Sequence, residues 1–186
     1  DLAVFRAVPN MTVICPADAN ETVEAVKAMA AMDGPCYLRL NRNDYPNVTK
    51  EGARFEIGVP RILKHGTDVA LFAAGYMTGV ALEAAKELEG SISVRVINVS
   101  TIKPMNKEVM RKMAEGCRAV VTAEEHNVAG GLGSAVAEAL CEDPLPMKMV
   151  GIKDTFGCSG HNYQEVLAYH GLTKEAVAEA VREMAG

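Results

Sequence analysis

The sequence predicts an α/β fold: a three-layer α/β/α domain with a mostly parallel, mixed sheet, preceded by a β-α-β remnant of a second α/β domain. Short apolar, β-branched runs recur along the 186-residue chain. Amphipathic stretches with helical spacing separate these runs. Because parallel strands need a crossover connection, the repeated order of strand, helix and strand indicates parallel neighbours.

Residues 1–50 predict one β-α-β unit. Apolar residues between two prolines make Met11–Cys15 a short buried strand, and Cys36–Leu40 is the second strand. The chain opens at Asp1 directly within an apolar-spaced stretch. We therefore expect it to be a fragment or a processed half of a longer protein.

The helix between these two strands has recognisable ends. Either Asp18 or Asn20 can cap its first turn, and Gly34-Pro35 ends it. The predicted buried face of this helix consists of Val23, Val26 and Ala30, with nearby alanines and methionines.

Residues 42–54 are polar and contain Pro46 and Gly52, which makes them the best linker candidate in the chain. We place a domain boundary near residue 50. This gives a first domain remnant over 1–50 and a second domain over 55–186.

The second segment alternates between strands and helices. Its predicted strands span residues 55–63 (irregular), 69–74, 94–99, 119–123 and 147–152. Its predicted helices span residues 77–89, 106–115, 131–141, 162–169 and 174–185, the last capped by Thr173. This order predicts helices on both faces of one sheet.

Composition narrows the class of protein. A net charge of -5 argues against a dedicated nucleic-acid binder, which needs a basic surface. No apolar run approaches the roughly 20 residues of a membrane span, and no secretion signal is visible, so we expect a soluble cytoplasmic protein. The cysteines lack C-x-x-C spacing, which favours reduced and mostly buried thiols over a zinc site. They are Cys15, Cys36, Cys117, Cys141 and Cys158.

A glycine-rich turn, Gly130-Gly-Leu-Gly133, follows one predicted strand and opens a helix. Helix N-termini can bind anions. However, a dinucleotide fingerprint needs a third glycine at the position that Val136 occupies. The favoured interpretation is that these glycines let the helix pack tightly on the sheet.

Glu124, Glu125 and His126 end a predicted strand, where α/β proteins place ligands. They could perform acid–base chemistry or hold a metal. Consecutive strand residues point in different directions, so the three cannot all converge. A surface or interface cluster is the favoured interpretation.

Arg42, with Arg39 nearby, follows another strand at its carboxyl end and could bind a phosphate in bidentate fashion. The alternative is a solvated loop arginine. Ser159 and His161 are too close in sequence for a reliable nucleophile–base pair, so we favour a turn with a helix cap. His65 and His170 are interpreted as structural residues.

The stretches DLAVFRAVPNMTVICPADANET and PCYLRLNRNDYP resemble the end of the pyrimidine-binding domain of the transketolase family. GTDVALFAAGYM, VRVINVSTIKPMN, AVVTAEEHNVAGGLGSAVAEAL and DTFGCSGHNYQEVLAYHGLT resemble the C-terminal domain of that family. The last stretch favours transketolase, particularly the C-terminal section of the split, two-subunit kind. The alternatives are 1-deoxyxylulose-5-phosphate synthase, the beta subunit of a 2-oxo acid dehydrogenase and a non-catalytic interaction or regulatory module.

The resemblance implies thiamine diphosphate and Mg²⁺ as cofactors of the intact enzyme, phosphorylated sugars as substrates and a homodimer. It also implies that Arg42 binds the sugar phosphate. The family's catalytic glutamate, substrate histidine and diphosphate motif have no counterpart in residues 1–186. We therefore expect no catalysis by this chain alone and a partnership with an N-terminal thiamine-diphosphate-binding section or subunit. We also expect an exposed apolar patch where that section docks.

Overall fold

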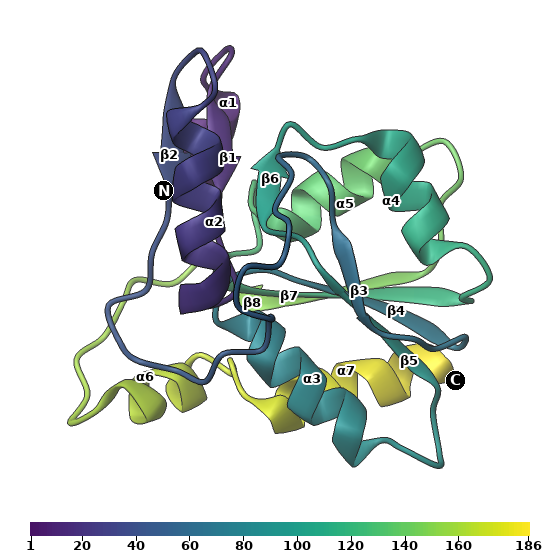
Figure 1. The fold of residues 1–186 in the computed structure, drawn as a ribbon. Coiled ribbons are helices and arrows are strands. Elements are labelled where there is room, and N and C mark those ends of the chain that lie inside the picture. The colour runs from purple at the N-terminus through teal and green to yellow at the C-terminus, as the bar shows by residue number, and fades with distance from the viewer.

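The computed structural model describes residues 1–186 and contains two sheets (Figure 1). The strands are β1 Thr12–Ile14, β2 Cys36–Leu38, β3 Arg61–Lys64, β4 Val69–Ala73, β5 Val94–Asn98, β6 Thr101–Lys103, β7 Ala119–Asn127 and β8 Met147–Ile152. The helices are α1 Leu2–Ala7, α2 Ala19–Ala30, α3 Met77–Glu87, α4 Lys107–Ala114, α5 Leu132–Leu140, α6 Tyr163–Tyr169 and α7 Lys174–Ala185.

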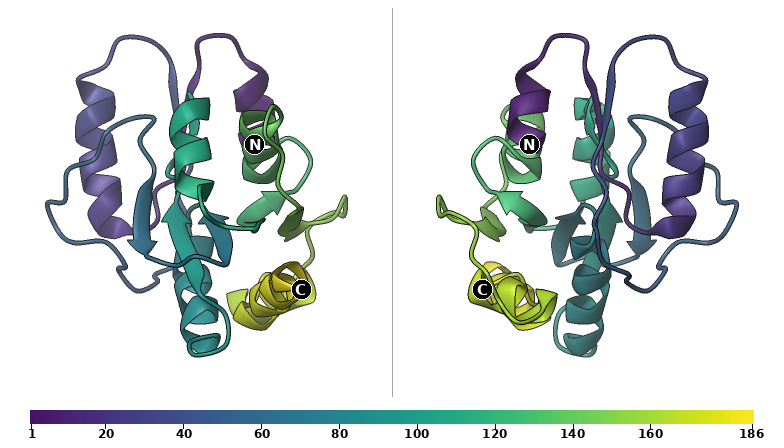
Figure 2. Two further views of the ribbon diagram at one scale, coloured as in Figure 1. Left: turned by 90° about the vertical axis from the view of Figure 1, so that its right-hand side faces the viewer. Right: turned by 90° about the vertical axis from the view of Figure 1, so that its left-hand side faces the viewer.

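The larger sheet has the order β3-β5-β4-β7-β8. Strands β4, β5, β7 and β8 run parallel, and β3 is antiparallel to β5. Alternate residues of β4 enter opposite cores: Leu71 packs in the core under α3 and α7, and Phe72 in the core under α4 and α5. Figure 2 shows the helices on the two sides of this sheet. The predicted three-layer fold with a mixed, mostly parallel sheet is confirmed.

The smaller sheet, in the order β2-β1-β6, joins the two segments of the chain. Its parallel β1–β2 pair confirms the predicted β-α-β unit. Strand β6, which the sequence analysis missed, comes from the second segment and pairs antiparallel with β1. Leu2 and Val13 lie in the same core cluster as Phe72. The two segments therefore share a core, and the boundary near residue 50 stays a prediction.

The predicted buried face of α2 is wrong for its three named residues. Val23 and Val26 are 53% and 48% exposed, and Ala30 is exposed as well. The inward positions belong to Ala25 and to Glu21, whose carboxylate accepts hydrogen bonds from Ala17 N (2.7 Å) and Asn98 Nδ2 (3.0 Å). Because these bonds replace water around a buried charge, Glu21 can face inward and the valines outward. The helix cap is Asp18, which accepts from Glu21 N.

The prediction that most cysteines are buried is also wrong. All five are free; Cys15 and Cys117 are buried and Cys36 is half-buried. Cys141 is exposed because it is the C-cap residue of α5, and Cys158 is exposed because it lies in the loop before α6. These two thiols are open to solvent.

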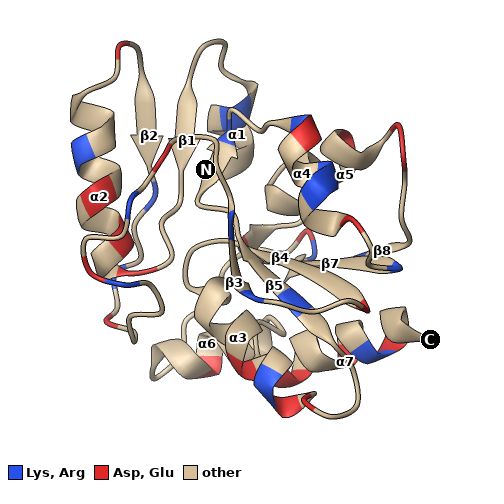
Figure 3. Ribbon diagram, turned by 45° about the vertical axis from the view of Figure 1, so that its right-hand side comes forward, with Lys and Arg blue, Asp and Glu red and all other residues tan.

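Charges of both signs lie side by side on the outer helices (Figure 3). Arg182 and Lys174 of α7, for example, face Glu87 of α3 at 2.9 and 3.8 Å. None of the helices is long and apolar enough to serve as a membrane span.

Candidate functional site

Residues at the carboxyl ends of β2 and β7 meet in one polar junction. Asn41, which follows β2, donates a hydrogen bond from Nδ2 to Glu125 Oε2 of β7 at 2.9 Å. Arg39 Nη1 lies 4.0 Å from the same oxygen. The structure therefore brings together two groups of polar residues that are more than 80 positions apart in sequence.

The prediction that Glu124, Glu125 and His126 cannot all converge is confirmed. Glu124 and His126 lie on one side of β7, with His126 Nδ1 3.8 Å from Glu124 Oε2, and Glu125 faces Asn41 on the other side. The surface interpretation is wrong for Glu124 and His126, which are 1% and 9% exposed. Their burial follows from the length of β7, which continues beyond the predicted end at residue 123.

Glu124 caps helix α5. Its two carboxylate oxygens accept hydrogen bonds from Leu132 N (2.7 Å) and Gly133 N (2.8 Å). A helix N-terminus stabilises negative charge, and here the anion is a side chain of the same protein. A Cβ at Gly133 would lie only 2.7 Å from Met149 Sδ of β8. The prediction that these glycines allow tight packing of the helix on the sheet is confirmed.

Burial raises the pKa of Glu124 from 4.5 to about 7, against the opposing effect of the N–H groups of Gly133 and Leu132. A carboxyl group whose pKa is higher in the folded state binds more protons there than in the unfolded state. Its favourable contribution to stability is complete below pH 4.5 and is lost as the pH rises through 7. Glu124 therefore makes folding pH-dependent in this range.

We expect the Glu124→Gln variant to lose this dependence, because glutamine does not titrate. Urea unfolding of both proteins at several pH values between 4.5 and 7.5 checks this. The unfolding free energy of the wild type should fall with pH relative to that of the variant. His126, whose pKa burial lowers, acts in the opposite direction but is present in both proteins. Parallel pH profiles would contradict the prediction.

Of the two candidate arginines, only Arg42 is available to a ligand. Arg39 is held by Asp1 Oδ2 at 3.3 Å and lies near Glu125, with its side chain 22% exposed. Burial raises the pKa of the nearby Cys15 thiol to about 11, and the positive charge of Arg39 opposes this shift. Arg42 is exposed, and its side chain forms no hydrogen bond or ion pair within residues 1–186.

Asn41 and Tyr163 are functional candidates that the sequence analysis missed. Asn41 Nδ2 lies 2.5 Å from Tyr163 Oη of α6, and Asn41 Oδ1 accepts from Asn43 N at 3.0 Å. An asparagine that starts a turn is a common sequence feature. Nothing in the sequence pairs it with a tyrosine 122 positions later.

The predicted helix-cap role for the residues around His161 is confirmed. Asn162 caps α6 through Glu165 N, and His161 N donates to Glu165 Oε2 at 3.1 Å. Ser159 and His161 are both exposed. His170 is the C-cap residue of α6, and its Nε2 lies 3.7 Å from Cys158 Sγ. His65 lies exposed in the turn before β4.

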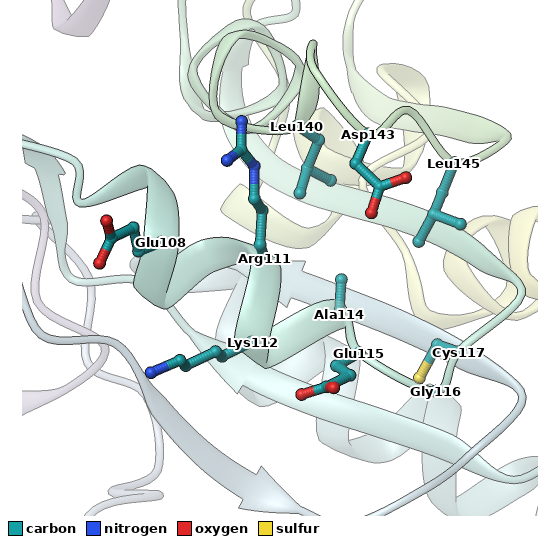
Figure 4. Close-up of a pocket in the computed structure, with 10 residues that line it drawn as sticks. All are labelled: Glu108, Arg111, Lys112, Ala114, Glu115, Gly116, Cys117, Leu140, Asp143 and Leu145. Carbon is teal, nitrogen blue, oxygen red and sulfur yellow. The ribbon is translucent and has the colours of Figure 1, made fainter.

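A separate cavity of about 480 Å³ lies at the opposite, amino-terminal ends of β7 and β8 (Figure 4). Ala114, Cys117, Leu140 and Leu145 supply its apolar lining. Arg111 points across it and is paired with Glu142 at 2.6 Å. Because it is at the other end of the sheet from Glu125, this cavity is not part of the polar junction.

The fold and the junction define the class of protein: an α/β protein with polar residues at the carboxyl ends of its strands, where such folds bind ligands. The family model described as "Transketolase, C-terminal domain" matches residues 58–177. The model described as "Transketolase, pyrimidine binding domain" matches residues 1–48. The chain belongs to the transketolase family, whose enzymes depend on thiamine diphosphate.

Individual relatives agree with this assignment. The solved structure described as a split gene transketolase in an inactive beta4 tetramer is similar to this chain, with a TM-score of 0.94 and 46% identity over 99% of this chain and 61% of that one. A 6-deoxy-6-sulfo-D-fructose transketolase subunit of Clostridium sp. (strain MSTE9) is 39% identical over 99% of this chain and 58% of its own length. A 1-deoxy-D-xylulose-5-phosphate synthase of Thioalkalivibrio sulfidiphilus is 36% identical over 98% of this chain and 28% of its length.

The chain spans between 47% and 59% of the length of five curated transketolase relatives that it matches. Its own residues do not fit the metal-diphosphate end of thiamine diphosphate. Residues 1–186 contain no group of three or more His, Cys, Asp or Glu side chains that could hold a metal ion. The N-terminus of α5, which could otherwise receive a phosphate, holds the carboxylate of Glu124.

Proposed function

We propose that this chain is the C-terminal section of a transketolase and that, in the intact enzyme, it supports the transfer of a two-carbon ketol unit between phosphorylated sugars. The observation that carries the proposal is Arg42: an exposed, unpaired guanidinium at the carboxyl end of β2 in a chain of this family. A guanidinium matches the oxygens of a phosphate with two parallel hydrogen bonds. Arg42 would therefore bind the phosphate of the sugar.

The remaining parts of the site come from a partner. We propose that an N-terminal section, fused or separate, supplies the ligands of thiamine diphosphate and Mg²⁺, and that two such units form a homodimer. Similarity to a transketolase subunit and to a split gene transketolase supports a separate N-terminal subunit. In this assembly residues 1–50 would complete the pyrimidine-binding domain and residues 55–186 would form the C-terminal domain.

The outer surface of the first segment fits such a partner. Val4 on α1 and Val23 and Val26 on α2 are 66%, 53% and 48% exposed. The outer edge of β2 is unpaired, because its only neighbour in the sheet is β1. Exposed apolar side chains and a free strand edge are both typical of a surface that another chain or domain covers. We propose that the N-terminal section covers this surface.

A ketol-transfer assay with xylulose 5-phosphate, ribose 5-phosphate, Mg²⁺ and thiamine diphosphate tests the proposal. We expect no activity from the chain alone and activity when the N-terminal section is added, because residues 1–186 contain no group of side chains that could hold the metal. Activity of the chain alone would contradict this account of cofactor binding.

The 36% identity to a 1-deoxy-D-xylulose-5-phosphate synthase favours a second candidate function within the family. Pyruvate and glyceraldehyde 3-phosphate would replace the two sugar phosphates as substrates in the same assay. If product forms from pyruvate and glyceraldehyde 3-phosphate but not from the two sugar phosphates, the reaction is that of the synthase. Inactivity with both pairs in the restored assembly would favour a non-catalytic interaction or regulatory module.

A further inference from the structure

The loop that carries Arg42 is fixed at both ends. At its far end, the carboxylate of Asp18 accepts hydrogen bonds from Val48 N and Thr49 N, both at 2.6 Å, and from Thr49 Oγ1 at 2.7 Å. At its near end, Asn41 bonds to residues of β7 and α6. A loop with no helix or strand of its own is therefore held by side chains from both segments of the chain.

The near end is the one that adjoins Arg42. The Asn41 amide donates to Glu125 Oε2 at 2.9 Å and lies 2.5 Å from Tyr163 Oη, and its carbonyl oxygen accepts from Asn43 N. These bonds fix the backbone on both sides of Arg42. Glu125 and Tyr163 thus hold Asn41, and Asn41 shapes the turn at whose centre Arg42 lies.

Aromatic packing supports the middle of the same loop. The ring of Tyr45 meets the ring of Tyr76 edge-on, with centroids 5.4 Å apart, and Tyr76 meets Tyr163 in the same way at 5.5 Å. Such pairs have a preferred geometry and therefore restrict movement. Burial raises the pKa of Tyr163, which favours the protonated form of its hydroxyl group.

We propose that Tyr163 and Glu125 are positioning residues that set the orientation of Arg42 toward the substrate phosphate through Asn41. Bidentate recognition of phosphate requires the guanidinium plane to be held within a narrow range of positions. This inference rests on the proposed phosphate role of Arg42. It gives the second segment a part in substrate recognition.

The Tyr163→Phe variant of the intact enzyme tests this role, because it removes one hydroxyl group and keeps the ring against Tyr76. We expect the KM for phosphorylated sugars to rise about five-fold, the effect of one lost hydrogen bond, with kcat unchanged. The KM for unphosphorylated sugars should stay the same. The inhibition constant of inorganic phosphate should rise by the same factor as the KM.

Three further variants complete the test. Tyr169→Phe lies on the same helix, at a residue that is 76% exposed and whose hydroxyl forms no hydrogen bond, and it should leave every constant unchanged. Glu125→Gln keeps an oxygen that can accept from Asn41 and should stay close to the wild type. Glu125→Ala should raise the KM for phosphorylated sugars.

A double variant separates this proposal from the one on which it rests. If Tyr163 acts through Arg42, Tyr163→Phe has no further effect in an Arg42→Ala background. An effect of equal size in both backgrounds, or an equal effect on both kinds of sugar, would overturn the positioning role. If Arg42→Ala raises the KM only for phosphorylated sugars but Tyr163→Phe leaves this KM unchanged, only the positioning role fails. If Arg42→Ala is not phosphate-selective, both proposals fail.

Discussion

Replacing Arg42 with alanine in the intact enzyme is expected to raise the KM for phosphorylated sugars by about ten- to a hundred-fold, the range that corresponds to the loss of a charged hydrogen bond. The KM for unphosphorylated sugars should not change. The reason is that the Arg42 side chain is exposed, has no partner within residues 1–186 and therefore has its full hydrogen-bonding capacity free for a ligand. Initial-rate kinetics with matched pairs of phosphorylated and unphosphorylated sugars measure this difference.

A second arginine in the same connection provides the matched control. Arg54 is also exposed, but it is paired with Glu56 at 2.9 Å and lies twelve positions beyond Arg42. Arg54→Ala should leave both KM values unchanged, since an exposed ion pair contributes little. Arg42→Lys should fall between the wild type and Arg42→Ala, because lysine keeps the charge but loses the bidentate geometry. An equal effect of Arg42→Ala on both kinds of sugar would refute the phosphate role.

The regular elements of the larger sheet could be predicted because their signals are local. Strand β8 begins and ends at the predicted residues 147 and 152, and α7 begins after its predicted cap Thr173. A strand that is buried on both faces gives a continuous apolar run, as in β4, where every residue is buried. A helix cap depends on only the next three or four residues.

Features that depend on distant partners could not be predicted. Strand β6 has only three residues, and it is defined by pairing with β1, which lies nearly ninety positions earlier. The inward face of α2 follows from a bond between Glu21 and Asn98, and the valine pattern that indicated the opposite face is local. Pattern-based prediction assigns apolar residues to the core, so it fails where a paired polar group takes the inward position.

In the candidate site, too, residues with a local signal could be predicted and contacts between distant residues could not. The position of Arg42 after a strand was visible in the sequence, because carboxyl ends of parallel strands collect at one edge. The hydrogen bond between Asn41 and Tyr163 was not visible, since it joins a loop residue to the first residue of α6 through the tertiary fold. The burial of Glu124 was also not visible, because the helix N-terminus that compensates its charge lies next to it only in space.

That compensation leads to the second large expected effect: Gly131→Ala should lower the free energy of unfolding by about 2–5 kcal/mol, through overpacking and the loss of buried hydrogen bonds. A Cβ at this position would overlap Oε2 of Glu124 and lie 2.8 Å from His126 Nδ1. The carboxylate cannot move away without leaving Leu132 N and Gly133 N unpaired. Urea unfolding of the 186-residue chain measures the loss.

The cause can be isolated by two comparisons. Gly157→Ala places the same methyl group where nothing lies within 4 Å and should change the unfolding free energy by less than about 0.5 kcal/mol. In a Glu124→Ala background the carboxylate is gone, so Gly131→Ala should cost clearly less than it does in the wild type. That coupling is expected because the glycine is required to leave room for the carboxylate that caps α5. An equal cost in both backgrounds would mean that His126 or the backbone, and not Glu124, excludes a side chain at residue 131.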